Sequence, residues 1–118
     1  MTGDARGVSS GEKRVPPLGF ARVRGSSTTP TLVDGDRLLV SYRRPVAVGD
    51  LVVARFADGV VVVKRASERR TARDGSPAWW LLSDNPDEGV DSRHRGPVAD
   101  DDVIAVTVAR VWPRPRRL

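Results

Sequence analysis

The chain has 118 residues, 39% of them hydrophobic, which suits one compact domain with a modest core rather than two domains. It contains no cysteine, which excludes disulfides, a thiolate nucleophile and a cysteine metal site, and we expect neither a metal nor a cofactor. The net charge of +5 permits contact with nucleic acid. Its arginines are dispersed and its aromatic residues few, so we expect no stable nucleic-acid partner.

The apolar runs, such as residues 60–63, are far shorter than the roughly 20 residues that span a bilayer. The first residues lack the apolar stretch of an export signal. We therefore expect a cytoplasmic protein without a membrane anchor.

Residues 1–17 are polar and end in two prolines, which predicts a disordered leader. A folded domain is expected over residues 18–113 and a basic tail over residues 114–118. Within the domain, short apolar runs rich in Val, Leu and aromatic residues are separated by Gly, Asp and Pro. They predict strands over residues 20–24, 37–42, 51–56, 60–65, 79–82 and 103–112. Asp58-Gly59 predicts a tight hairpin turn, and the whole pattern indicates an all-β fold.

Two polar segments interrupt this pattern, residues 67–77 and residues 83–102, and both are predicted to be loops. A loop of about 20 residues without structure of its own is unusual in a compact domain. The second segment is therefore expected to serve a function.

Lys64 ends the apolar run 60–63, in a predicted strand that reads as buried on both faces. Lysine is rarely buried without a partner, so this position has two interpretations. Either the ammonium extends to solvent from the strand end, or the amine lies in apolar surroundings. In the second case desolvation lowers the lysine pKa toward the range of a general base.

Residues 25–30 read Gly-Ser-Ser-Thr-Thr-Pro, which on its own is an ordinary Ser/Thr turn. A neutral lysine, however, can accept the proton of a serine hydroxyl, as in the Ser/Lys variants of the catalytic triad. Gly25 lets a substrate approach the backbone, and Pro30 stiffens the turn. Ser27, between them, is the candidate nucleophile.

Taken together and in this order, these segments resemble the type I signal peptidase-like proteases, which use a Ser/Lys dyad. Residues 25–32 followed by residues 35–36 are similar to the family's nucleophile segment, Gly-x-Ser-Met-x-Pro-Thr-Leu and then Gly-Asp. Residues 49–53 look like the Gly-Asp start of a family strand, and residues 63–65 look like the lysine segment.

Further along, residues 84–98 contain Asp-Asn, Asp-Ser-Arg and Gly-Pro-Val in the order that the family shows before its last strand. The resemblance thus covers residues 20–112. It implies the fold of the signal peptidase and LexA catalytic core, which is all-β with coiled, barrel-like mixed sheets.

By this resemblance Ser27 attacks a peptide carbonyl, its backbone N–H is one oxyanion donor, and Lys64 is the general base. The resemblance implies that six residues support the site structurally: Arg65, Asp84, Asn85, Asp91, Ser92 and Arg93. The residues expected beside the substrate are Gly25, Ser26, Thr28 and Pro30.

The sequence departs from the family pattern at three places. Thr28 replaces the usual Met, and Gly25 stands where some members carry a serine that assists the oxyanion hole. Gly89 stands where many members have a serine that orients the lysine amine, and the first glycine of that loop is replaced by Ser83. These differences bear on activity more than on fold.

The expected partner is a protein or peptide precursor that adds as a β-strand beside the nucleophile segment and residues 60–65. Among family members, the short anchorless ones resemble proteases that trim the precursor of nickel-type superoxide dismutase, which makes that precursor one hypothesis for the substrate.

Two alternatives remain open. A LexA-type self-cleaving repressor domain has similar segments, but this chain has no Ala-Gly or Cys-Gly pair to cleave, and its Asp-Ser-Arg and Gly-Pro-Val segments favour the signal peptidases. A binding domain that kept the fold without the activity is the other alternative, and the substitutions at Thr28 and Gly89 favour it.

Overall fold

The structure, a computed structural model, describes residues 17–25, 28–85, 87 and 89–118. Ser26, Ser27 and nearly all of the predicted leader lie outside the described residues. The strands are β1 (Leu18–Arg22), β2 (Arg37–Ser41), β3 (Leu51–Arg55), β4 (Val61–Thr71), β5 (Pro77–Leu82), β6 (Val98–Ala99), β7 (Val103–Trp112) and β8 (Arg116–Arg117). A single helical turn, α1 (Ser92–Arg95), and a 3-10 turn, η2 (Asp100–Asp102), lie between β5 and β7.

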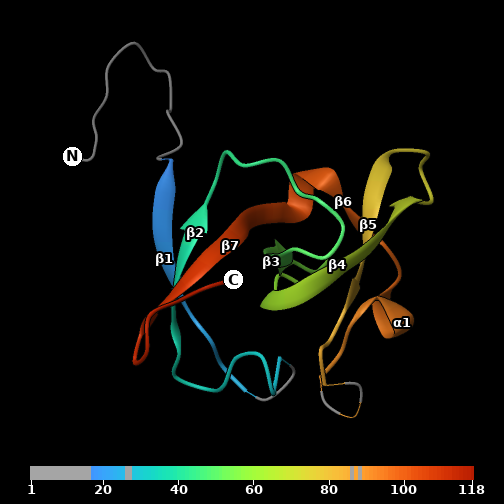
Figure 1. The fold of residues 1–118 in the computed structure, drawn as a ribbon. Helices are drawn as coiled ribbons and strands as arrows, with labels where there is room; N and C mark the ends of the chain where they lie inside the picture. The colour runs from blue at the N-terminus through green and yellow to red at the C-terminus, as the bar shows by residue number, and fades with distance from the viewer. Residues whose placement is uncertain (1–16, 26–27, 86, 88) are drawn as a thin grey trace.

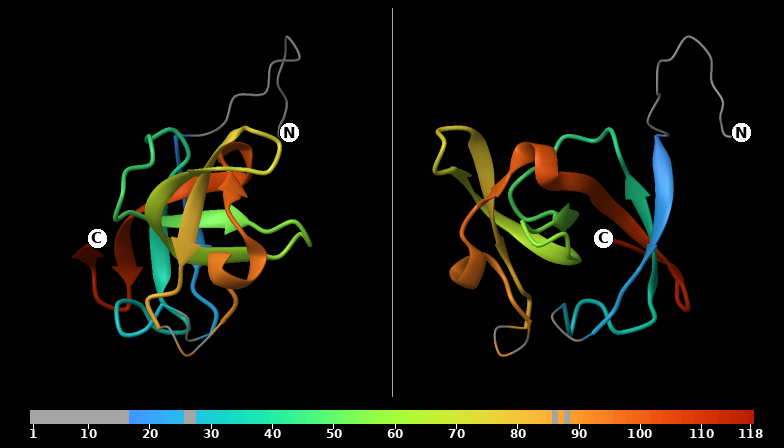
Figure 2. Two further views of the ribbon diagram at one scale, coloured as in Figure 1. Left: turned by 90° about the vertical axis from the view of Figure 1, so that its right-hand side faces the viewer. Right: turned by 180° about the vertical axis from the view of Figure 1, so that it is seen from behind.

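The described strands form one sheet in the order β1-β2-β7-β3-β4-β5-β6, and β8 pairs with β7 (Figure 1). Neighbouring strands are antiparallel in every pair that the described residues form, where the expectation allowed mixed sheets. The strands cross at steep angles in the rotated views, so the sheet is strongly coiled (Figure 2). The predicted all-β fold is confirmed.

Coiling explains why β3 is apolar at successive positions rather than at alternate ones. Val52 and Ala54 pack into one core cluster with Ala66, Trp79 and Leu81. The intervening β3 residues pack into a second cluster on the opposite face. Because the curved sheet covers both of its own faces near β3, this strand needs hydrophobic side chains on both sides.

The turn between β3 and β4 is the hairpin that the sequence predicts. Gly59 has a φ of 87°, which glycine adopts without steric cost, and its N–H donates to the carbonyl of Phe56. The Phe56 N–H in turn donates to the carbonyl of Val60. The turn sets the register that pairs Val52 with Lys64.

The prediction of a loop over residues 67–77 is wrong, because β4 continues to Thr71 and pairs with β5 from Pro77. The outer part of β4, residues 68–71, is polar and exposed, so no apolar alternation marks it as a strand. Arg69 and Arg70 compensate by stacking over the rings of the two tryptophans of β5, at 4.5 and 4.2 Å from the ring centroids.

The predicted long loop, residues 83–102, contains α1, β6 and η2, each too short to show a hydrophobic period. The basic tail includes β8, whose residues Arg116 and Arg117 pair with β7. Among the described residues, no helix has the length and apolar character needed to cross a membrane.

Candidate active site

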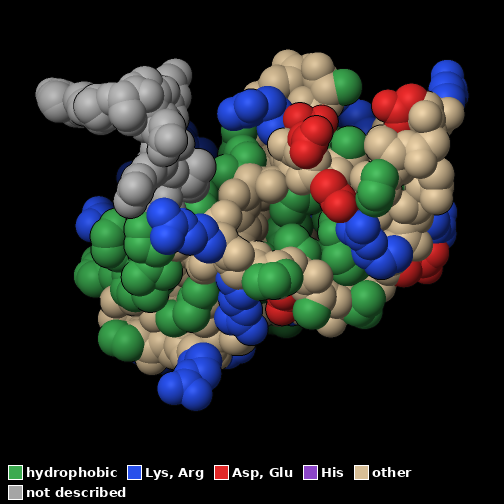
Figure 3. Space-filling view, turned by 90° about the horizontal axis from the view of Figure 1, so that it is seen from above, with side chains coloured by type: hydrophobic (Ala, Val, Ile, Leu, Met, Phe, Trp, Pro, Cys, Tyr) green, Lys and Arg blue, Asp and Glu red, His purple; other side chains and the backbone are tan. Residues whose placement is uncertain are grey.

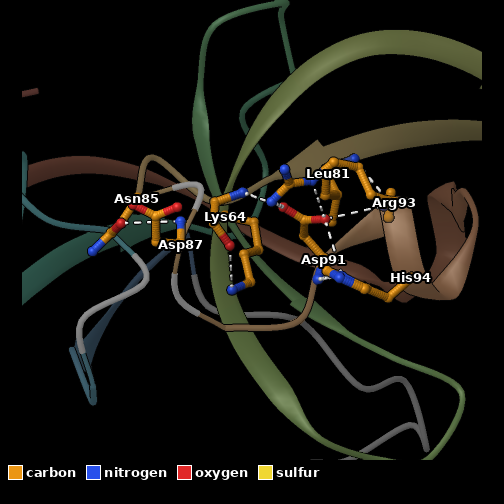
Figure 4. A network of polar contacts seen from close by, with 9 residues as sticks. Lys64, Leu81, Asn85, Asp87, Asp91, Arg93 and His94 are labelled. Carbon is orange, nitrogen blue, oxygen red and sulfur yellow. Dashed lines mark hydrogen bonds and ion pairs between the residues drawn. The ribbon is translucent and has the colours of Figure 1, made fainter.

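Lys64 lies in β4 at the point where the pairing of this strand changes. Residues 61–65 pair with β3, whereas β5 joins β4 only from Arg65 onward. The lysine side chain is 2% exposed, so it does not extend to solvent. Its amine donates a hydrogen bond of 3.0 Å to the hydroxyl of Ser83, the residue that follows β5 (Figure 4). The buried interpretation of Lys64 is therefore the correct one.

The surroundings of the amine shift its acid–base equilibrium. Burial lowers the pKa of Lys64 below its ordinary 10.5, and the negative charge of Asp91 opposes this shift. The hydroxyl of Ser83 can accept a hydrogen bond from the amine but carries no charge to stabilise the ammonium. Burial therefore increases the fraction of neutral amine at a given pH, and the neutral amine is the form that can accept a proton.

Ser83 is itself held by Asp91, which is fully buried. The backbone N–H of Ser83 donates to Asp91 Oδ2 at 2.9 Å. Desolvation acts to raise the pKa of Asp91, but hydrogen bonds from the Arg93 side chain and from the backbone N–H groups of Ser83 and Arg93 outweigh it and lower that pKa to about 2. Asp91 is thus a fixed anion that positions the backbone of Ser83.

The same aspartate begins α1. Asp91 Oδ1 accepts hydrogen bonds from the backbone and side chain of Arg93, each at 3.0 Å. The buried Ser92 hydroxyl accepts from the backbone N–H of Leu81 in β5 at 2.9 Å. Asp91 is the N-cap of α1, and the exposed side chain of His94 accepts a hydrogen bond from the Asp91 backbone N–H at the same helix end (Figure 4). The predicted supporting residues Asp91, Ser92 and Arg93 therefore lie together at the start of α1, next to Ser83, the partner of the lysine.

A second group of contacts ties the loop after β5 to the segment that follows Ser27 in the chain. Asp84 accepts a hydrogen bond from the Thr31 hydroxyl at 2.8 Å and forms an ion pair with Arg65 at 2.6 Å. Burial acts to raise the pKa of Asp84, but the hydrogen bonds from Arg65 and Thr31 outweigh it and lower that pKa. Asn85 donates to the Thr29 hydroxyl at 3.0 Å. Residues separated by more than 50 positions are thereby brought together.

The candidate nucleophile Ser27 and its neighbour Ser26 lie outside the described residues, but the chain on both sides of them is described. The Gly25 N–H donates to Asp34 at 2.8 Å, and the carbonyl of Thr28 accepts from the Leu32 N–H at 2.9 Å. Thr28 is buried, whereas Pro30 is exposed. Both ends of this segment are therefore fixed to the fold.

A cleft of about 300 Å³ opens beside residues 21–24 and the first residues of β4. Thr28 and Val63, which lie next in sequence to Ser27 and Lys64, both contribute to its wall. The described residues that line it are Ala21, Arg22, Val23, Arg24, Thr28, Val53, Val61, Val62 and Val63. The cleft is thus largely apolar where it faces β3 and β4.

A larger cavity, of about 640 Å³, opens on another face, beside the loop that joins β2 to β3 (Figure 3). Arg44, Arg69 and Asp100 contribute polar side chains to it. None of its lining residues belongs to the group around Lys64.

Ser83 accepts the hydrogen bond of the Lys64 amine, and the sequence pattern had assigned this serine no role. The family pattern places the orienting serine at the position of Gly89, and Ser83 reads only as a replaced glycine. The hydroxyl reaches Lys64 because β5 returns antiparallel to β4 and pairs Leu82 with Arg65, which brings the next residue beside the lysine. A serine directly after a strand that pairs with the lysine strand is the signal that identifies it.

Comparison with known proteins places this geometry in a family. The chain matches the Peptidase S24-like family over residues 8–108. It is 31% identical over 112 residues to mitochondrial inner membrane protease subunit 1 of Schizosaccharomyces pombe, a match that covers 77% of this chain and 71% of the relative. It is 42% identical over 67 residues to LexA repressor 1 of Pseudomonas syringae pv. tomato, covering 56% of this chain and 30% of that protein. The chain belongs to the Peptidase S24-like family of serine peptidases.

Proposed function

We propose that this protein is an endopeptidase in which Ser27 is the nucleophile and Lys64 the general base. The observation that carries the proposal is the Lys64 amine, which is buried, bound to a neutral hydroxyl at 3.0 Å and lowered in pKa by desolvation. A structural lysine gains nothing from such surroundings, because burial of the ammonium costs free energy unless a counter-ion is in contact. A lysine that acts as a general base, by contrast, must be neutral, and desolvation favours the neutral amine.

The reaction proceeds in two stages. Neutral Lys64 accepts the hydroxyl proton of Ser27 as Ser27 Oγ bonds to the carbonyl carbon of the scissile peptide bond, and the backbone N–H of Ser27 donates to the developing oxyanion. Lys64 then returns the proton to the leaving amine as the C–N bond breaks. In the second stage Lys64 takes a proton from water, whose oxygen attacks the acyl-enzyme ester, and the proton returns to Ser27 as the acid leaves.

Ser83 acts as a positioning residue in this proposal. Lys64 has a flexible side chain, and a single hydrogen bond to Ser83 limits the positions of its amine. Asp91 fixes Ser83 in turn through a charge-assisted hydrogen bond to its backbone. Ser83 thereby supplies the hydroxyl that the family pattern places at Gly89.

The substrate is a peptide segment in extended conformation. Residues 61–64 of β4 pair with β3 on one edge, and no described strand pairs with their other edge, so the backbone there can accept an added strand. Ala21, Val23 and Val63 form an apolar wall beside it, which suits small aliphatic side chains. We propose a protein precursor as the physiological substrate, and the nickel-type superoxide dismutase precursor is the one to test first.

The decisive experiment measures cleavage of a mixed peptide library by mass spectrometry with three proteins: the unaltered chain, S27A and S26A. We expect S27A to lose activity by at least about 10³-fold, because the nucleophile is absent. S26A removes the adjacent hydroxyl and is expected to retain most of the activity, which makes it the matched control. Equal turnover by S27A, at an unchanged melting temperature, contradicts the assignment of Ser27.

A library in which no peptide is cleaved by the unaltered chain favours the alternative of a binding domain. The protein is then incubated with the superoxide dismutase precursor. Cleavage of that precursor would indicate a narrow substrate requirement, and no cleavage would indicate a lack of activity. Cleavage of that precursor by S26A but not by S27A would establish both the substrate and the nucleophile.

A further inference from the structure

Two arginines line the cleft to which Thr28, the residue after the proposed nucleophile, also contributes. Arg22 ends β1, Arg24 follows two residues later, and both line the cleft with exposed side chains. Ala21 and Val23, which alternate with them, are half-buried and buried and form part of the apolar wall. The described lining of the cleft contains no acidic residue, so its charge is positive.

These arginines differ from those around the lysine. Arg65 pairs with Asp84, and Arg93 pairs with Asp91, so each holds a loop of the site in place. The side chains of Arg22 and Arg24 form no hydrogen bond or ion pair with any described residue. Their guanidinium groups are therefore free to bind a ligand within the part of the chain that the structure describes.

The spacing of the two arginines matches that of an extended peptide. Successive residues of a β-strand point to opposite faces and rise about 3.3 Å each, so residues two apart lie about 6.6 Å apart on one face. A strand lying along residues 21–24 presents one set of side chains to Ala21 and Val23 and the other set to Arg22 and Arg24. The second set meets two unpaired positive charges.

We propose that the cleft selects peptide segments in which acidic residues alternate with small apolar residues, the acidic ones pairing with Arg22 and Arg24. This inference rests on the proposed function for its account of the bound strand. Arginine suits the role because its planar guanidinium binds a carboxylate through two parallel hydrogen bonds. The overall charge of +5 adds attraction at long range, but only these two positions would read the sequence.

Binding to the inactive S27A protein tests the proposal without requiring cleavage. Three fluorescent ten-residue peptides are compared by anisotropy, with alanine alternating with aspartate, asparagine or lysine. Asparagine matches aspartate in size, so the comparison isolates the charge. We expect the aspartate peptide to bind about 3- to 30-fold more tightly than the asparagine peptide, since two exposed ion pairs contribute modestly. This ratio should fall as the salt concentration rises.

The double variant R22E/R24E, made in the S27A background, should reverse the order, so that the lysine peptide binds most tightly. The matched control R73E/R114E makes the same change in net charge at two exposed arginines outside the cleft lining and should leave the order unchanged. Equal binding of the aspartate and asparagine peptides, no binding of any peptide, or the same loss of preference in both double variants would overturn the proposal.

The failure of this inference is distinguishable from failure of the proposed function. If the protein cleaves library peptides without any preference for acidic residues, the peptidase assignment stands and the proposed role of Arg22 and Arg24 is contradicted. If the protein binds acidic peptides through these arginines but cleaves no peptide, the proposed binding preference stands and the catalytic assignment is contradicted.

Discussion

The site depends at the residue scale on one buried amine. The Lys64 amine donates its hydrogen bond to the Ser83 hydroxyl rather than to a carboxylate, and Asp91 acts on it as a nearby charge. The sequence distinguished Lys64 because a lysine directly after four valines is chemically unusual. The sequence could not show whether the Lys64 amine reaches solvent, because this depends on where residues 83–91 lie in the fold.

The first prediction concerns the pKa of Lys64. The chain has two lysines, Lys13 and Lys64, so NMR of protein labelled at the lysine ε carbon gives two signals, and the variant K64M assigns them. We expect the Lys64 signal to titrate below pH 10.5 because burial disfavours the ammonium. A titration midpoint at or above 10.5 would show that the folded state stabilises the charge.

The sign of this shift also determines a stability change. A lowered pKa means that the unfolded chain binds more protons than the folded one at a pH between the folded pKa and 10.5. The free energy of unfolding therefore rises with pH across that window. K64M, which removes the buried amine, should abolish this rise and leave the protein as stable as the unaltered chain or more stable near pH 7. Urea unfolding at several pH values measures both effects.

The second prediction concerns Ser83. Removing its hydroxyl in S83A should lower kcat by about 10- to 100-fold and leave KM within about twofold, because the amine loses its position and the substrate cleft does not change. S83T retains a hydroxyl and should recover part of kcat. S92A, which removes a neighbouring buried hydroxyl bound to the backbone of Leu81, is the control for general destabilisation. A rise in KM with kcat unchanged would contradict the positioning role.

At the scale of elements, the site is held by contacts between chain segments that the sheet brings together. Asp84 links the loop after β5 both to Arg65 in β4 and to Thr31 in the segment after Ser27. The spacing of Asp84 and Asn85 in the sequence suggested a supporting role by resemblance alone. Their partners could not be inferred, since Thr29 and Thr31 lie more than 50 residues away.

The third prediction follows from this link. D84N keeps the size of the side chain but weakens the charge-assisted hydrogen bonds, so it should lower the free energy of unfolding by about 1–3 kcal/mol. Amide hydrogen exchange over residues 28–33 should accelerate, because the segment loses an anchor. D101N, an exposed aspartate of η2, is the matched control and should change neither quantity. Unchanged exchange in D84N would show that the segment is held by other contacts.

At the scale of the whole molecule, the coiled sheet determines what could be predicted. Strand positions near β2, β3 and β7 followed from short apolar runs because those strands are buried on at least one face. The outer half of β4 could not be predicted because it carries exposed polar residues, and the elements between β5 and β7 are too short to show a hydrophobic period. The fold was therefore more predictable than the contacts that complete the site.

The fourth prediction is the acid stability of the molecule. The pKa of Asp91 is lowered from 3.8 to about 2, so its stabilising effect is complete above pH 3.8 and is lost as the pH falls toward 2. The difference corresponds to about 2 kcal/mol. D91N should be less stable than the unaltered chain at pH 6 and should lose less stability between pH 4 and pH 2, as measured by urea unfolding. Parallel pH profiles for the two proteins would contradict this role of Asp91.

The distance from Ser27 Oγ to Lys64 Nζ decides whether the two residues form a catalytic dyad. A crystal structure determined at alkaline pH, where the amine is neutral, would provide it. We expect a distance of about 3.2 Å or less, with Lys64 still bound to Ser83. A well-ordered Ser27 whose hydroxyl points away from the cleft, about 6 Å or more from an amine that remains on Ser83, would contradict the dyad.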